Sequence, residues 1–129
     1  MPLRPFHLAF PIININKTIK WYTSVLDCRI GRKDQRWVDF DFYGHQISRH
    51  LIDDNNTQIH TNPVDGNNIP ARHFGIILEQ ENWQKLSNNL QRNGVEFIIK
   101  PYLRFKGKIG EQSTMFIKDP TGNVLEFKS

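Results

Sequence analysis

The sequence is poor in cysteine and has no long apolar run. Cys28 is the only cysteine among 129 residues, so no disulfide can form within the chain, and this usage is typical of a reducing compartment. No segment reaches the roughly 18 apolar residues that a transmembrane helix needs. Residues 1–7 lack the apolar run of a signal peptide. These absences predict a cytoplasmic protein that does not act in a membrane.

An excess of charge of one sign is also missing. The net charge is +4, and 38% of the residues are hydrophobic, which predicts one ordinary domain with a modest core. Four basic residues cluster at Arg29, Arg32, Lys33 and Arg36. A solvated face explains them most simply, and a patch for an anionic partner is the alternative. No basic motif interleaved with aromatic residues resembles a nucleic-acid-binding module, so no nucleic-acid partner is expected.

The last eleven residues, 119–129, carry the most informative pattern. The text DPTGN at 119–123 is typical of a turn. Apolar segments on either side predict a β-hairpin with strands at 114–117 and 124–127. Side chains alternate along a strand, so Glu126 shares a face with Val124. Both faces carry apolar residues, and we therefore expect Glu126 in an interior. A buried carboxylate needs a cation, hydrogen bonds or a metal.

One pattern of elements occurs twice along the chain. Hydrophobic periodicity predicts a strand, a helix and three strands in each half, at 6–13, 15–26, 29–32, 37–42 and 46–52, then at 73–78, 81–93, 95–99, 114–117 and 124–127. Unit one covers 5–52 and unit two covers 71–129. Residues 53–70, rich in Asp, Asn, Gly and Pro, are predicted to be a loop or linker between them. Two tandem βαβββ units predict an α+β fold with a half-barrel-like sheet around a central cleft.

Superposition of the two halves places three possible metal ligands at related positions. His7 and His73 lie at the start of the first strand of each unit, about 66 residues apart. Glu126 lies four residues after the glycine of its turn, and Ser48 stands at the matching position of unit one. Each histidine alone is more often a hydrogen-bonded strand residue. Two imidazoles and one carboxylate together form the facial set that holds Fe(II), Mn(II) or sometimes Zn(II).

Several segments carry a family resemblance: the strand with His7, WYTSVLDC at 21–28, HFGIIL at 73–78 and DPTGNVLEF at 119–127. With them the chain resembles the vicinal oxygen chelate superfamily, which includes glyoxalase I, extradiol dioxygenases, fosfomycin-resistance thiol transferases and bleomycin-binding proteins. GHQISRH at 44–50 and RFKGKIGEQ at 104–112 look like a bacterial group of predicted extradiol-type dioxygenases. The resemblance covers nearly the whole chain.

The resemblance implies a divalent metal held by His7, His73 and Glu126. Fe(II) is the first expectation, and Mn, Zn or Ni are alternatives that the same ligands accept. Glyoxalase I has a fourth ligand where Ser48 stands here, which argues against a glyoxalase I site. The usual extradiol enzyme has four units and this chain has two, a departure that bears on the reaction more than on the metal. Two-unit members of the superfamily also imply a homodimer.

Polar residues of the fourth strand are predicted to surround this metal. Gln46, Ser48 and His50 share one face of the strand, so Gln46 and Ser48 are candidates for substrate binding. His50 is the acid–base candidate, because imidazole titrates near neutrality. A histidine exposed at a strand end is the alternative for His50.

Residues 101–112, which contain two glycines, are predicted to be a long connection that forms a lid. Tyr102 and Arg104 are catalytic candidates there, and Glu111 is a substrate-binding candidate. The Arg104 guanidinium could hold a carboxylate or phenolate through paired hydrogen bonds. A structural role for Arg104 is the alternative.

These expectations define the predicted function. The resemblance implies a metal-dependent enzyme that acts on a small molecule, first of all an Fe(II) ring-cleaving dioxygenase of an aromatic diol. One alternative keeps the metal and changes the reaction to thiol transfer, isomerisation or a lyase reaction. Another is a metal-free protein that binds an aromatic drug. A pure binder has no need of two histidines and a carboxylate at related positions.

Overall fold

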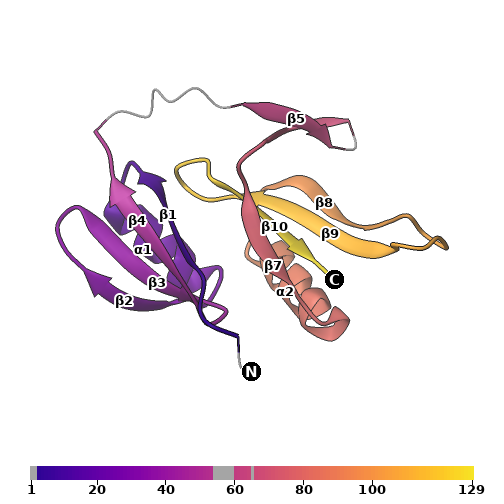
Figure 1. Ribbon diagram of the computed structural model, residues 1–129, viewed down its shortest axis with the longest axis horizontal. Helices are drawn as coiled ribbons and strands as arrows, with labels where there is room; N and C mark the ends of the chain where they lie inside the picture. The colour runs from indigo at the N-terminus through magenta and orange to yellow at the C-terminus, as the bar shows by residue number, and fades with distance from the viewer. Residues whose placement is uncertain (1–2, 54–59, 65) are drawn as a thin grey trace. The chain divides into compact units, whose positions relative to one another are not determined.

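Two compact units make up the chain, Met1–Thr57 and Gln58–Ser129. The computed structural model describes residues 3–53, 60–64 and 66–129 (Figure 1). The predicted linker therefore lies partly outside the described residues, at 54–59 and 65. Among the described residues, no helix is both long enough and apolar enough to cross a membrane.

The first unit is a four-stranded sheet with one helix. Its elements are β1 (His7–Ile12), α1 (Ile15–Ser24), β2 (Arg29–Lys33), β3 (Trp37–Phe42) and β4 (His45–Leu51), and the strand order is β1-β4-β3-β2. β1 pairs with β4 in parallel, and the other pairs are antiparallel. Asn14 caps α1, since its Oδ1 accepts the Lys17 N–H at 2.9 Å.

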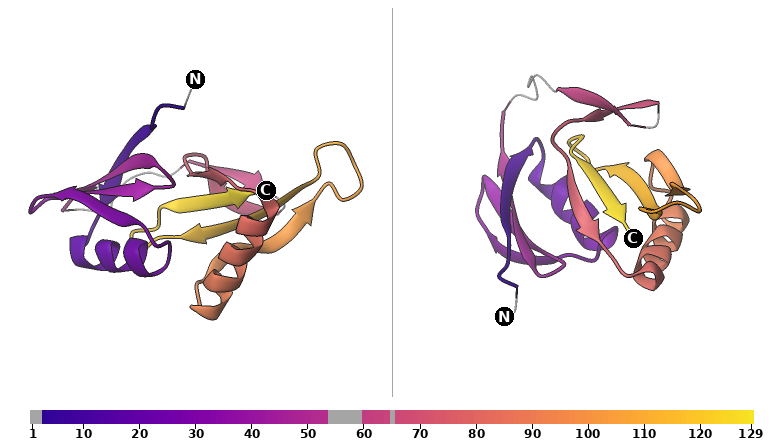
Figure 2. Two further views of the ribbon diagram at one scale, coloured as in Figure 1. Left: turned by 90° about the horizontal axis from the view of Figure 1, so that it is seen from below. Right: turned by 45° about the vertical axis from the view of Figure 1, so that its right-hand side comes forward.

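The second unit repeats this arrangement and adds a hairpin. Its elements are β5 (Thr61–Val64), β6 (Asn67–Pro70), β7 (Phe74–Ile77), α2 (Gln80–Arg92), β8 (Phe97–Arg104), β9 (Gln112–Lys118) and β10 (Val124–Lys128). The four-stranded sheet has the order β7-β10-β9-β8, while β5 and β6 pair with each other. In both views of Figure 2, α2 lies along one face of this sheet. Gly94, which follows the helix, has a φ of +68°, as expected just past a helix end.

The fold prediction is confirmed: the chain is α+β and contains two βαβββ modules. Each four-stranded sheet is open, with two edge strands, so neither closes into a barrel. The closing hairpin also forms as predicted. One Asp119 carboxylate oxygen accepts the backbone N–H groups of Thr121, Gly122 and Asn123 at 2.9–3.0 Å, and Gly122 adopts a φ of +101°.

The prediction of a loop throughout 53–70 was wrong. Residues 61–64 and 67–70 are strands, and Ile69, only 1% exposed, packs with Ile99, Phe116 and Val124. Polar residues dominate this short hairpin, so the composition resembles a loop even though Ile69 supplies an apolar anchor. The Asp-Gly dipeptide at 65–66 was an available hairpin signal.

The prediction of a long connection at 101–112 was also wrong in its first part. β8 continues to Arg104, so Tyr102 and Arg104 lie in a strand rather than in a lid. Pro101 made a strand improbable, because proline has no N–H for the ladder. β8 is an edge strand with register irregularities around residues 99–102, and such strands tolerate proline.

Gly75 allows β7 to approach the strand that carries Glu126. The two residues are register partners, and a Cβ built on Gly75 would overlap the backbone carbonyl of Glu126. We predict that Gly75→Ala lowers the free energy of unfolding by about 1–3 kcal/mol, because the two backbones would have to separate. Urea denaturation followed by circular dichroism measures this.

Gly31→Ala is the matched control. A Cβ on Gly31 would meet the Asp39 Cβ at 3.4 Å, an ordinary contact, so its effect should stay within about 0.5 kcal/mol. Equal stability of the Gly75 and Gly31 variants would contradict this account of β7.

Candidate functional site

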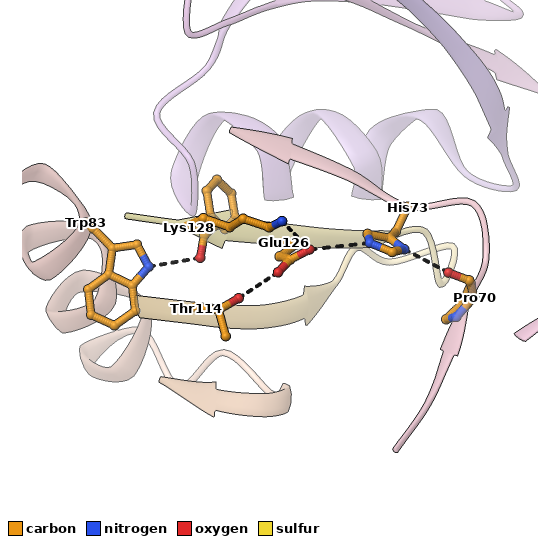
Figure 3. Close-up of polar contacts among 7 residues, drawn as sticks. Pro70, His73, Trp83, Thr114, Glu126 and Lys128 are labelled. Carbon is orange, nitrogen blue, oxygen red and sulfur yellow. Dashed lines mark hydrogen bonds and ion pairs between the residues drawn. The ribbon is translucent and has the colours of Figure 1, made fainter. Parts of the chain in front are cut away.

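Glu126 is a buried carboxylate of the second unit. It lies in β10 and is 7% exposed, as its sequence pattern predicted. The Thr114 hydroxyl donates a 2.8 Å hydrogen bond to its Oε2. Its Oε1 lies 3.4 Å from His73 Nε2 and 3.8 Å from Lys128 Nζ (Figure 3). The carboxylate therefore has one strong neutral partner and two nitrogen neighbours at longer range.

The hydrogen bond on the far side of the His73 ring determines what faces Glu126. His73 Nδ1 lies 2.8 Å from the backbone oxygen of Pro70, and a carbonyl oxygen can only accept. Nδ1 must therefore carry a proton, and in the neutral ring Nε2 presents its lone pair to Glu126 Oε1 (Figure 3). Two electron-rich atoms face each other, an arrangement that a proton or a metal cation between them stabilises. The donor set thus fits a divalent metal.

Packing fixes both members of this pair. The His73 ring meets Phe116 edge-on, with centroids 5.5 Å apart, and Phe116 is the register partner of Glu126 on β9. Trp83 of α2 donates its indole N–H to the Phe127 carbonyl at 2.9 Å (Figure 3). This bond ties α2 to β10 one residue beyond the carboxylate, so the strand carrying Glu126 is held from the helix side.

His7 of the first unit is also held through its Nδ1, here by a chain of two side chains. Its Nδ1 lies 2.7 Å from Gln46 Oε1, and Gln46 Nε2 donates to Asp39 Oδ2 at 3.4 Å. The Ser48 hydroxyl donates to Asp39 Oδ1 at 2.6 Å. Asp39, a carboxylate only 7% exposed, was not among the residues predicted for the site. Its position in an apolar strand, WVDFDF, was the available signal.

The strand registers place Ser48 in the first unit where Glu126 lies in the second. Ser48 pairs with Ala9, two residues after His7, and Glu126 pairs with Gly75, two residues after His73. The Ser48 hydroxyl is buried and donates to Asp39. In the first unit, a carboxylate is therefore found on β3, directly across from Ser48, instead of on β4.

A cavity of about 480 Å³ opens on this part of the first unit. It is lined by Pro5, Phe6, His7, Gly31, Arg32, Asp39, Phe40, Asp41, Gly44, His45 and Gln46. Acidic and basic side chains both contribute, and the His7 ring lies at the wall with its Nδ1 side bonded to Gln46. The cavity can accept a small polar or aromatic molecule next to His7.

The remaining predicted residues lie at different places. His50 is exposed in β4, opposite Trp37. The Tyr102 hydroxyl is buried and has no hydrogen-bond partner among the described residues, and the Arg104 guanidinium lies 5.0 Å from the Phe105 ring centroid. Glu111 accepts the Gly107 N–H at 2.9 Å. Tyr102 and Glu111 line a cavity of about 680 Å³ beside α2, whose lining includes neither His73 nor Glu126.

Two further observations limit the chemistry. Within either unit, the described residues hold no group of three His, Cys, Asp or Glu side chains close enough to bind a metal. Burial raises the pKa of the Cys28 thiol to about 12, with Asp41 and Asp27 adding to the effect and Arg49 opposing it. Cys28 therefore stays protonated near neutrality and is not a ready nucleophile.

Comparison with known proteins gives a consistent result. The family model described as the Glyoxalase/Bleomycin resistance protein/Dioxygenase superfamily matches residues 4–127. A glyoxalase/bleomycin resistance protein/dioxygenase from Alicyclobacillus acidocaldarius is 31% identical, with a TM-score of 0.82 over 97% of this chain and 89% of that one.

Two more distant structures share the fold. A fosfomycin resistance protein from Listeria monocytogenes is 15% identical, with a TM-score of 0.72 over 99% of this chain and 93% of that one. A lactoylglutathione lyase from Agrobacterium tumefaciens is 12% identical, with a TM-score of 0.70 over 98% of this chain and 93% of that one.

Thr114 is fully buried, and its hydroxyl is the closest partner of the Glu126 carboxylate. We predict that Thr114→Val lowers the free energy of unfolding of the metal-free protein by about 1.5–3 kcal/mol, because the buried charge loses a hydrogen bond. Thr114→Ser, which keeps the hydroxyl, should lose less. Urea denaturation in the presence of a chelator measures both, and a Val variant at least as stable as the Ser variant would contradict the assigned bond.

Proposed function

Because the chain belongs to the glyoxalase/bleomycin resistance protein/dioxygenase superfamily, we propose that it is a metal-dependent enzyme of small molecules. The proposed reaction is extradiol-type ring cleavage of an aromatic diol with Fe(II). One diol and one O₂ are consumed, both oxygen atoms enter the ring-opened product, and no external reductant is required. The reaction therefore needs a metal, a site for the diol and a group that moves protons.

The observation that carries this proposal is the pairing of His73 Nε2 with Glu126 Oε1 at 3.4 Å. When the ring is neutral, neither atom carries a proton. The Pro70 carbonyl accepts a hydrogen bond from His73 Nδ1, and the Thr114 hydroxyl donates one to Glu126 Oε2. We propose that His73 and Glu126 bind the metal together with His7, whose Nδ1 is likewise engaged. Two histidines and one carboxylate suit Fe(II), and they also accept Mn, Zn or Ni.

When bound, the metal would supply Lewis acidity and one-electron chemistry to the diol and O₂. The chain would supply the remaining functions. We propose that His50 moves a proton of the diol and that Arg104 orients an anionic oxygen of the substrate. Tyr102, whose hydroxyl is buried and which lines the cavity beside α2, stays a catalytic candidate. The ammonium of Lys128, near Glu126, adds positive charge that favours an anionic substrate.

The three substrate-binding candidates already have partners within their own units. Gln46 contacts His7 and Asp39, Ser48 contacts Asp39, and Glu111 contacts Gly107. We therefore propose that Gln46 and Ser48 support the site and that Glu111 shapes the loop between β8 and β9. The homodimer and the cytoplasmic location stay predictions.

Other reactions on this fold remain the second candidate. The fosfomycin resistance protein and the lactoylglutathione lyase share it, so thiol transfer, isomerisation or a lyase reaction would use the same three ligands. Metal analysis with a catechol and O₂-uptake assay separates these possibilities. Metal binding without O₂ uptake over a panel of catechols favours the second candidate, and absence of metal favours a drug-binding protein.

The metal ligands can be tested one at a time. We predict that His7→Ala, His73→Ala and Glu126→Ala each lose most of the bound divalent metal while circular dichroism shows an intact fold, because each removes one of three ligands. Metal content after loading and desalting is the measurement. His60→Ala, which changes an exposed histidine outside this set, is the matched control and should bind as the unchanged chain does.

Stoichiometric metal in all three ligand variants would contradict the proposed site. Loss in the His73 and Glu126 variants alone would restrict the site to the second unit and remove His7 from it.

His50 is proposed to act on protons and not on the metal. His50→Ala should keep its metal and lower turnover by a factor of about 10²–10⁴. Ser48→Ala should leave the metal content nearly unchanged, since its hydroxyl faces Asp39. Loss of metal in the His50 variant would show that the assignment of roles along β4 is wrong. Unchanged turnover would leave His50 as an exposed strand residue without a catalytic role.

A further inference from the structure

We propose that Asp39 fixes the tautomer of His7 through Gln46, so that the ring presents an unprotonated Nε2. Asp39 and Gln46 are then positioning residues of the first unit, which act through His7. The purpose of this arrangement rests on the proposed metal function. Its geometry, however, is contained in one unit and can be tested without a metal.

The first step is the chemistry of Asp39. An ionised carboxylate only accepts hydrogen bonds. Its Oδ1 accepts from the Ser48 hydroxyl at 2.6 Å, and its Oδ2 faces Gln46 Nε2 at 3.4 Å. The carboxylate is 7% exposed, and these two side chains are the donors that face its oxygens. Asp39 therefore favours the NH₂ end of the Gln46 amide.

The second step is the orientation of Gln46. An amide has one donor end and one acceptor end, so an NH₂ group directed at Asp39 leaves Oε1 for His7. The opposite orientation would place two acceptors, Oε1 and the carboxylate, against each other. The longer contact of 3.4 Å contributes modest free energy, but it selects one of the two amide orientations.

The third step transfers this choice to the imidazole. Gln46 Oε1 lies 2.7 Å from His7 Nδ1 and can only accept, so Nδ1 carries the proton. In the neutral ring Nε2 then has a lone pair, as a metal ligand requires. His45, the neighbouring histidine in the same cavity, does not compete for Gln46 through Nδ1, because that atom accepts the Phe6 N–H at 2.8 Å.

The second unit reaches the same tautomer by a different route. His73 Nδ1 is held by a backbone carbonyl, that of Pro70, with no side chain between. Two different hydrogen-bond arrangements thus leave Nε2 unprotonated in both neutral histidines. A histidine as exposed as His7 could satisfy its ring with water alone. A role as metal ligand explains why a buried carboxylate and an amide are arranged behind it.

Nitrogen NMR of histidine-labelled protein in a chelator tests the proposal directly, since long-range proton–nitrogen spectra distinguish the two neutral tautomers. In the unchanged chain, His7 should carry its proton on Nδ1. Gln46→Leu removes the acceptor, and Asp39→Asn lets the residue 46 amide turn around. Both should shift the His7 ring toward the Nε2-protonated form, and both should weaken Zn(II) affinity by about 10–100-fold.

A matched control separates this effect from loss of charge. Asp41→Asn removes a carboxylate from the same strand and the same cavity. It should neither change the His7 tautomer nor lower Zn(II) affinity more than about twofold. Gln46 is exposed, so Gln46→Leu keeps the buried core intact even if Asp39→Asn fails to fold.

The outcomes distinguish this inference from the proposed function. A His7 tautomer unchanged in Gln46→Leu, or Zn(II) affinity within twofold of the unchanged chain in that variant, overturns the inference while leaving the metal site standing. Predicted tautomer shifts in a chain that binds no metal support the inference about Asp39 and overturn the proposed function.

Discussion

A carboxylate buried within a β-sheet is costly unless its charge is compensated, and much of the second unit provides this compensation for Glu126. Thr114 donates from the neighbouring strand, while His73 and Lys128 approach the other oxygen. β7 can lie alongside because residue 75 has no side chain to meet the Glu126 carbonyl. The imidazole nitrogen of His73 and the carboxylate oxygen of Glu126 are both electron-rich, and a cation between them would stabilise the pair.

The duplicated architecture explains why the first unit looks like an altered copy. The strand orders correspond, and the parallel strand pairs share one register, yet Ser48 stands in the first unit where Glu126 stands in the second. Asp39 places a carboxylate on the adjacent strand, where it bonds Ser48 and Gln46. The two units thus place a buried carboxylate on different strands, Glu126 on β10 and Asp39 on β3, and in each unit it lies near the histidine of the first strand or near that histidine's partner.

Local patterns predicted the elements that depend on local chemistry. The turn at 119–123 and the burial of Glu126 follow from residue type and spacing, and both are observed. Asp39 could not be identified in this way, because its role depends on cross-strand partners that only the register reveals. The strand through Pro101 was not predicted. A sheet edge tolerates proline, but the edge position of β8 is a property of the sheet and not of the segment.

The proposed site holds one divalent metal through His7, His73 and Glu126, with both imidazoles bound through Nε2. Anomalous X-ray diffraction at the iron edge, from crystals of the Fe(II)-loaded chain grown without oxygen, tests it most directly. The account predicts one strong peak within bonding distance of both Nε2 atoms and a Glu126 carboxylate oxygen. A peak bonded through Nδ1, a peak that excludes His7, or iron bound elsewhere on the chain would contradict it.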